Sequence, residues 1–310
     1  MFFSKLHPNT KIAYRLIFAT LLMVAAVVTV INIAMPATTD SARIAFASYD
    51  GNDFEIFTVN PDGSGLRQLT DNAVDDWGAT WSPDHTQLAF RSGIGAESAI
   101  YIMDLDTNNI QRVSAPQMRV GNPYYQGTMT WSPDGAYLAY DADFNGNWDI
   151  WTSRISDGQL TRLTNSISED LHPDWSPDGT QIVFNRTDEN GFLQIFMMNS
   201  NGTNITQLSN AHAATVMYPR WSPNGDDIVF FINESSSAAD LYMMDASGRN
   251  VRQITTDLAV DRVAVFSPDG ESLVFRSERD GDSDIYTLNL NTGKINPVSR
   301  NHTMDMSPDW

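Results

Sequence analysis

The chain of 310 residues contains no cysteine, which excludes disulfide bonds, thiolate catalysis and a lipid-anchored N-terminal cysteine. Histidine is also scarce, and none of the five histidines forms an i, i+4 pair or another spacing typical of metal ligands. The sequence has no Gly-x-Ser-x-Gly motif and no glycine-rich phosphate loop before a helix. It therefore offers no catalytic motif of these common kinds.

Positive charge is limited as well, because 19 Lys and Arg residues stand against 38 Asp and Glu residues. Residues 1–37 contain three basic residues and no acid, so the rest of the chain carries a net charge of −22. A body this acidic argues against nucleic acid, whose binding depends on neutralising phosphates. Its field suits a basic partner or cations, although solubility alone also explains it.

One long apolar run is present, from Leu16 to Met35, and it is ended by Pro36. Its 20 uncharged residues would span about 30 Å as a helix, which is the thickness of a bilayer core. Pro36 also spoils a small-x-small cleavage site. We therefore expect a cytoplasmic basic head at 1–15, a transmembrane signal anchor at 16–35 and an exported, periplasmic or extracellular body at 38–310. A cleaved signal peptide is the alternative.

The pattern Trp-Ser-Pro-Asp-Gly recurs along the body. Copies of the pattern, some with one residue replaced, begin at Trp81, Trp131, Trp175, Trp221 and Phe266, and Trp310 matches the same tryptophan. These marks stand 50, 44, 46, 45 and 44 residues apart, a period typical of repeat architectures. Proline presets φ for a turn and Asp-Gly tolerates positive φ, so each mark predicts a strand that ends at the aromatic residue and then reverses.

Each repeat carries three further strand signals. In the repeat that follows Trp175 they are Val183-Phe184, Ile195-Phe196 and Leu208-Ser209, and equivalents of all three occur in all six repeats. Four short strands, here called A to D with A ending at the aromatic mark, therefore recur six times. This organisation predicts an all-β, six-bladed β-propeller.

The two ends of the body complement each other. Residues 38–46 align with 132–140, so the body starts inside the turn motif. We expect a strand at about 306–310 to pair with 43–48 and close the ring. Because strands alternate in direction, the loops from strand D to the next strand A share one face with the B–C turns. This D–A loop face should point away from the membrane.

The repeated turn, together with Asp149-Ile150-Trp151, Asp284-Ile285-Tyr286 and Leu163-Thr164, resembles the WD40-like repeat of the TolB propeller family. The resemblance covers residues 38–310. It implies a six-bladed propeller that works outside the cytoplasm as a protein-binding module. The apolar segment here stands where the family's namesake has a separate N-terminal domain.

Four acids stand five residues before the repeat aromatic, at the start of strand A. They are Asp76, Asp170, Asp261 and Asp305, and Gln126 and Val216 hold this position in the other two repeats. Carboxylates gathered at one channel mouth would raise each other's pKa and attract cations or basic side chains. The alternative is that each acid caps its own D–A loop.

Side chains of the types enriched in interfaces lie in the same loops. We expect Trp77, Tyr124, Tyr125, His172, Tyr218 and Arg262 to join the four acids in binding a partner. Neighbouring positions add Met118, Leu171, Met217, Met304 and Met306. Packing within the blades is the alternative role for each of them.

A weak metal motif occupies residues 141–149. Asp141, Asp143, Asn145 and Asp149 resemble the acidic half of a calcium loop, but the distal bidentate Glu is missing. A plain B–C hairpin turn is the alternative.

These observations predict a membrane-anchored, extracytoplasmic propeller that binds a protein or peptide through its D–A loop face. A carbohydrate-processing enzyme, or a cation-dependent site at the acidic channel mouth, is the alternative.

Overall fold

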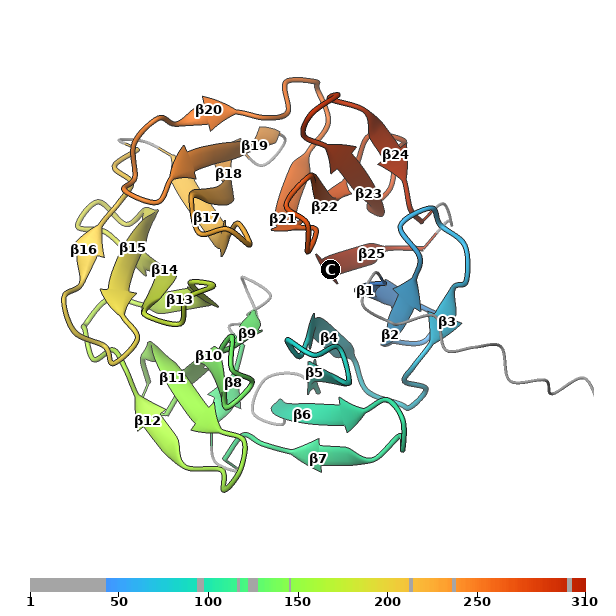
Figure 1. The fold of residues 1–310 in the computed structure, drawn as a ribbon, viewed down its shortest axis with the longest axis horizontal. Helices are drawn as coiled ribbons and strands as arrows, with labels where there is room; N and C mark the ends of the chain where they lie inside the picture. The colour runs from blue at the N-terminus through green and yellow to red at the C-terminus, as the bar shows by residue number, and fades with distance from the viewer. Residues whose placement is uncertain are drawn as a thin grey trace, which may run out of the picture. The chain divides into compact units, whose positions relative to one another are not determined.

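The computed structural model describes residues 43–93, 98–115, 118–121, 128–144, 146–211, 214–235, 238–299 and 303–310. These residues form six antiparallel sheets that follow one another around a ring, and the sheets are the six predicted blades (Figure 1). Within these ranges no helix has the length and apolar character needed to cross a membrane. The predicted anchor at 16–35 lies outside the described residues.

Blades are numbered in chain order. Blade 1 contains β25 (Asp305–Asp309), β1 (Ile44–Tyr49), β2 (Phe54–Val59) and β3 (Arg67–Gln68). Blade 2 contains β4 (Asp76–Trp81), β5 (Gln87–Ser92), β6 (Ala99–Asp104) and β7 (Ile110–Arg112). Blade 3 contains β8 (Arg119–Val120), β9 (Met129–Trp131), β10 (Tyr137–Asp143), β11 (Trp148–Arg154) and β12 (Leu160–Arg162).

The second half of the ring is regular. Blade 4 contains β13 (Asp170–Trp175), β14 (Gln181–Thr187), β15 (Leu193–Asn199) and β16 (Thr206–Gln207). Blade 5 contains β17 (Thr215–Trp221), β18 (Asp227–Ser235), β19 (Ala238–Asp245) and β20 (Arg252–Gln253). Blade 6 contains β21 (Asp261–Phe266), β22 (Ser272–Ser277), β23 (Asp284–Asn289) and β24 (Ile295–Pro297).

The repeated turn has the geometry that its residues predict. In blade 4 the Ser176 hydroxyl donates to Asp178 Oδ1 at 2.6 Å and accepts the Gln181 N–H at 2.9 Å. Gly179 has φ of +71°, a value that glycine adopts without steric cost. The same serine-to-aspartate bond recurs after Trp81, Trp131 and Phe266, and asparagine replaces the aspartate after Trp221.

The predicted closure of the ring is confirmed. The last strand, β25, pairs antiparallel with β1, with Ala45 opposite Asp309 and Ser48 opposite Asp305. Trp310 packs against the cluster that contains Ile44 and Phe46. Figure 1 shows β25 in dark red beside β1 in blue, so the two ends of the described chain share one sheet.

Blade 3 differs from the predicted four-strand pattern. Its innermost position is divided between β9, which pairs with the first half of β10, and β8, which pairs with Ala142 and Asp143 in the second half. Met118 and Val120 are buried, because this part of the longer D–A connection contributes apolar side chains to the core. Met118 is therefore a packing residue.

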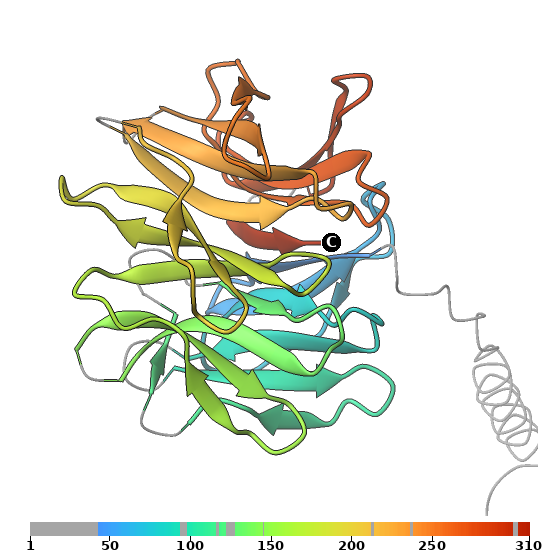
Figure 2. The same ribbon diagram turned by 60° about the vertical axis from the view of Figure 1, so that its left-hand side comes forward.

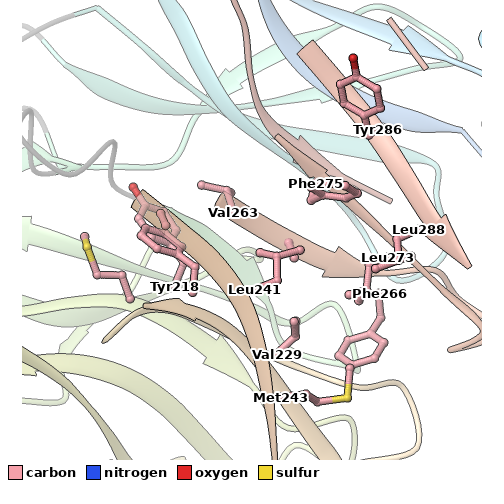
Figure 3. Close-up of a cluster of buried hydrophobic side chains, with 14 of the residues drawn as sticks. Tyr218, Val229, Leu241, Met243, Val263, Phe266, Leu273, Phe275, Tyr286 and Leu288 are labelled. Carbon is pink, nitrogen blue, oxygen red and sulfur yellow. The ribbon is translucent and has the colours of Figure 1, made fainter. Parts of the chain in front are cut away.

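Much of the core lies between adjacent blades. The largest cluster joins Val229 and Leu241 of blade 5 to Val263, Leu273 and Phe275 of blade 6 (Figure 3). Full burial of such a side chain contributes about 1.5–3 kcal/mol, so face-to-face packing of blades is the main favourable contribution. Figure 2 shows the blades succeeding one another in chain order.

Most inner strands contain a bulge near their middle. The register of strand A against strand B shifts in blades 1, 2, 4, 5 and 6. The residue three before the repeat aromatic has a left-handed φ in these blades, between +50° and +56°, at Gly78, His172, Tyr218, Val263 and Ser307. The bulge changes which way the first half of strand A directs its side chains.

Candidate functional site

The four predicted carboxylates of strand A lie at blade junctions. Asp76, Asp170, Asp261 and Asp305 are the first residues of β4, β13, β21 and β25, and all four are fully buried. Each faces an acid at the start of strand C in the preceding blade, as Asp170 does with Asp149. These side chains are enclosed between sheets, whereas the sequence predicts them at an open channel mouth.

Arginines neutralise several of these carboxylates. Arg186 holds Asp170 with two bonds, from Nε to Oδ1 at 2.6 Å and from Nη2 to Oδ2 at 2.8 Å. Arg162 pairs with Asp149, and Arg279 contacts Asp261 at 3.1 Å. Burial nevertheless raises the pKa of Asp170, because its desolvation outweighs the attraction of Arg186.

The junction of blades 1 and 2 has no such arginine contact among the described residues. There Asn72 binds both acids, with its N–H on Glu55 Oε1 at 2.6 Å and its Nδ2 on Asp76 Oδ2 at 2.8 Å. Asn72 belongs to the D–A loop, so Asp76 does bind its own loop as the alternative interpretation predicts. Burial raises the pKa of both carboxyl groups.

The aliphatic-hydroxyl signal of strand D has a structural explanation at these junctions. In every blade the hydroxyl accepts the backbone N–H of the aliphatic residue that begins the strand-C signal, as in Ile150 to Thr164 at 2.9 Å and Ile285 to Ser299 at 2.9 Å. Equivalent bonds join Ile56 to Thr70, Ile100 to Ser114, Ile195 to Ser209 and Leu241 to Thr255. The hydroxyl continues the C–D ladder where strand D has ended.

His172 and Tyr218 are also buried. Both occupy the bulge position, and their rings stack with centroids 3.9 Å apart. Asn185 Oδ1 accepts the Tyr218 N–H at 3.0 Å and lies 3.0 Å from His172 Nδ1. Burial raises the pKa of Tyr218. The pair therefore contributes to packing between blades 4 and 5, and Figure 3 places Tyr218 beside the cluster of blades 5 and 6.

Trp77 and Arg262 are only partly buried. The Trp77 ring stacks on Phe54 at 4.2 Å, and the guanidinium of Arg91 lies 5.9 Å from its centroid. Arg262 forms no hydrogen bond or ion pair with the described residues, and burial followed by repulsion from Arg276 lowers its pKa. Among the predicted binding residues that the structure describes, Trp77 Nε1 and Arg262 Nε are buried atoms without a hydrogen-bond partner.

The remaining predicted contacts have mixed outcomes. Tyr124 and Tyr125 lie outside the described residues. Leu171, Met217 and Met306 are buried, whereas Met304 is exposed. Roles in partner binding for these positions stay predictions.

The predicted calcium loop contains acids that already have partners. Asp143 pairs with Arg119 and accepts the Gly146 N–H, and Asp149 pairs with Arg162. Asp141 is fully buried and accepts the His172 N–H at 3.5 Å, whereas Asn145 lies outside the described residues. A calcium ion would have to displace these arginine contacts.

A different set of residues marks the D–A loop face. Nine large apolar side chains are exposed within the described ranges. Six of them lie in D–A loops or beside B–C turns, namely Tyr49, Val74, Phe144, Ile167, Leu258 and Met304. Three, Leu66, Ile110 and Val251, lie toward the C–D turns. A lone aliphatic residue in a polar loop was the available sequence signal for Val74, Ile167 and Leu258.

A family model for the TolB beta propeller domain matches residues 115–239 and 209–310, which together exceed half the chain. An uncharacterized protein of Agrobacterium fabrum is 27% identical over 160 residues, covering 49% of this chain and 52% of that protein. A TolB homolog of Chlorobium luteolum is 31% identical over 144 residues, covering 46% of this chain and 31% of that protein. The matches thus span about half or less of these relatives.

Solved structures share the fold. TolB from Acinetobacter baumannii superposes with a TM-score of 0.74 at 21% identity, over 88% of this chain and 67% of that one. An oligogalacturonate lyase in complex with manganese superposes with a TM-score of 0.61 at 18% identity, over 86% and 76%. At these identities the likeness concerns the fold alone.

Proposed function

Because the chain belongs to the TolB beta propeller domain family, we propose that its propeller is an extracytoplasmic module that binds a protein or peptide partner. The binding surface is the D–A loop face. One observation carries this assignment: six of the nine exposed large apolar side chains among the described residues lie on that face. Exposed apolar residues gathered on one face favour protein association.

The proposed partner surface is apolar with basic groups. Two D–A loops place an acid near their exposed apolar residue, Asp71 near Val74 and Glu169 near Ile167. The body is strongly acidic overall. An amphipathic segment with apolar and basic side chains complements such loops. The attraction comes from the loop acids and the net charge, since the strand-A carboxylates are buried.

We place the module in the periplasm, tethered by the apolar segment 16–35. The accessibility of the D–A loop face, which the alternation of strands predicts from the sequence, is part of the same proposal. Proteolysis of intact spheroplasts tests the location, and protection of the body from added protease would contradict it.

Partner binding can be tested with matched double variants of the full chain. Ile167→Ser with Leu258→Ser removes two exposed apolar side chains from the D–A loop face, and Leu66→Ser with Val251→Ser does the same toward the C–D turns. Each buried aliphatic group contributes roughly 1.5–3 kcal/mol, so the first pair should weaken binding at least about tenfold.

The measurement is quantitative recovery of crosslinked partners from membranes, followed by the affinity of the purified complex. The proposal expects a loss with Ile167→Ser/Leu258→Ser and wild-type recovery with the control pair. Equal recovery with both double variants would contradict the assignment of partner binding to the D–A loop face.

The alternative of a carbohydrate-processing enzyme gains no support at the predicted acids. Asp76, Asp170, Asp261 and Asp305 are fully buried, so a sugar would not contact them in this conformation. We therefore propose no second function.

A further inference from the structure

Two arginines face each other at the D–A end of blade 6. Arg262, the second residue of β21, lies directly opposite Arg276 in β22. Like charges at directly opposite positions of an antiparallel pair destabilise it. Among the described residues one acid pairs with them, Glu278, which accepts a bond from Arg276 Nη2 at 2.8 Å. The two guanidinium groups and this carboxylate leave one positive charge without compensation.

Arg262 carries that charge. Its Nε is buried without a hydrogen-bond partner, whereas its two terminal nitrogens are not buried and bind nothing within the described ranges. Burial, followed by repulsion from Arg276, lowers its pKa. Eight other arginines of the described residues do form ion pairs with acids. A chain with 38 acidic residues thus leaves this arginine without one.

The same two positions are filled differently in the other blades that the structure describes at this point. Blade 2 has Trp77 opposite Arg91, and there the cation is compensated by the Trp77 ring at 5.9 Å and the Gly121 carbonyl at 3.0 Å. In blades 1, 4 and 5 the pair contains no charge, namely Met306 and Ala47, Leu171 and Asn185, and Met217 and Phe231. Two opposed cations are therefore not a requirement of the fold.

The preceding blade gives Arg262 little cover. At the junction of blades 1 and 2, Phe54 stacks on Trp77, which holds the position of Arg262, with ring centroids 4.2 Å apart. Ala239 holds the place of Phe54 in blade 5, because each residue directly precedes the acid at the start of strand C. A methyl group therefore stands where the first junction has a phenyl ring. Alanine offers a guanidinium no cation–π contact.

The guanidinium of Arg262 also lies close in the chain to the proposed partner surface. Leu258, which is fully exposed, belongs to the D–A loop that leads into β21, and Arg262 is the second residue of that strand. Arginine is enriched at interfaces and among the residues that dominate their binding energy. Its planar fork matches a carboxylate with two parallel bonds.

We propose that Arg262 binds a carboxylate of the protein partner, with Arg276 as the second positive charge of the site. The inference rests on the proposed function and adds one acidic group to a partner surface that is otherwise apolar and basic. This carboxylate would neutralise the charge that Glu278 leaves over and relieve the repulsion between the two arginines. A carboxylate fits better than a phosphate, because the strongly acidic body repels a second negative charge.

The test measures the affinity of the purified complex with variants of the full chain. Arg262→Gln removes the charge, and Arg262→Lys keeps it without the fork. Arg67→Gln is the matched control, because Arg67 is an exposed arginine of β3 and its loss changes the net charge equally. Arg262→Gln should bind at least about tenfold more weakly than the wild type, Arg262→Lys should be intermediate and Arg67→Gln should match the wild type.

Two further measurements identify the bound group. A partner whose carboxylates have been converted to methylamides should bind the wild type and Arg262→Gln with equal affinity, because the group that distinguishes them is gone. Acetate is the probe for the site itself. At 100 mM, sodium acetate should slow the modification of Arg262 by phenylglyoxal at least about twofold relative to sodium chloride, and it should leave Arg67 unaffected.

The outcomes separate the two proposals. Full affinity of Arg262→Gln, a loss that persists with the methylamide partner, or equal protection of Arg262 and Arg67 by acetate would overturn the carboxylate site alone. A wild type that binds no partner would overturn the proposed function as well.

Discussion

Replacing Arg186 with methionine should destabilise the propeller through Asp170, a residue on the opposite strand. The Asp170 side chain has no solvent exposure, while that of Arg186 is 17% exposed. The two-bond contact at 2.6 and 2.8 Å is the only arginine contact of Asp170 among the described residues. Methionine keeps the apolar contact with Phe184 and Phe196, whose rings lie 5.4 Å from the guanidinium.

Removing one partner of a buried ion pair costs about 3–5 kcal/mol, and partial exposure of Arg186 lowers the expected loss to about 2–3 kcal/mol. For a domain of this size, that loss corresponds to a decrease in Tm of roughly 4–12 °C. Asp170→Asn leaves an arginine that can reach water, so it should cost less, about 1–2 kcal/mol. The double variant should recover part of the sum, because it contains no unpaired buried charge.

The assay is urea unfolding at pH 5 and pH 8, monitored by tryptophan fluorescence, of the wild type, the two single variants and the double variant. Without Arg186 the pKa of Asp170 rises further, so the folded variant binds a proton that the unfolded chain releases. Stability from this proton is present at low pH and is lost as the pH rises. Arg186→Met should therefore be less destabilising at pH 5 than at pH 8. A loss below about 1 kcal/mol at both pH values would refute the reasoning.

Two further predictions concern other junctions. Burial raises the pKa of Asp309 to about 6 despite the charge of Arg220. Protonation of Asp309 should therefore add about 1–3 kcal/mol to the free energy of unfolding at pH 4, and this stability should be lost as the pH rises through 6. Asp309→Asn should remove this dependence in urea unfolding between pH 4 and 7, and an unchanged slope would contradict it. Gly248→Ala should lower the free energy of unfolding by at least about 1 kcal/mol more than Gly158→Ala does. Both glycines have positive φ, but only a Cβ at position 248 would lie 2.7 Å from the Leu208 carbonyl oxygen, whereas a Cβ at position 158 would have no atom within 4 Å. Equal unfolding midpoints of the two variants would contradict this prediction, because they would show that the backbone around Leu208 accommodates the new Cβ without loss of stability.

The repeat made the architecture predictable from the sequence. Proline, aspartate and glycine fix the A–B turn through local φ preferences and one short hydroxyl bond, as at Ser176 and Asp178. Such local rules operate in each repeat, so the number of blades and the closure by β25 follow from counting. The division of the blade 3 inner strand does not follow, because burial of Val120 depends on contacts with β10.

The orientation of the strand-A acids could not be predicted for a related reason. Their spacing places Asp170 at the start of the inner strand, but the bulge at His172 determines where side chains in that half of the strand point. A left-handed φ at histidine or tyrosine is uncommon and has no strong sequence signal.

Pairing of β25 with β1 also affects the order of events during biosynthesis. Ser48 finds its partner Asp305 only after more than 250 further residues have been made. A chain that emerges from its N-terminal end therefore carries β1 with one unpaired edge for nearly the whole of translation. Long-range pairing of this kind slows folding and prolongs exposure of a strand edge to aggregation. The pairing of β25 with β1 should thus be slow, and a chaperone that shields the edge of β1 would increase the yield of native protein.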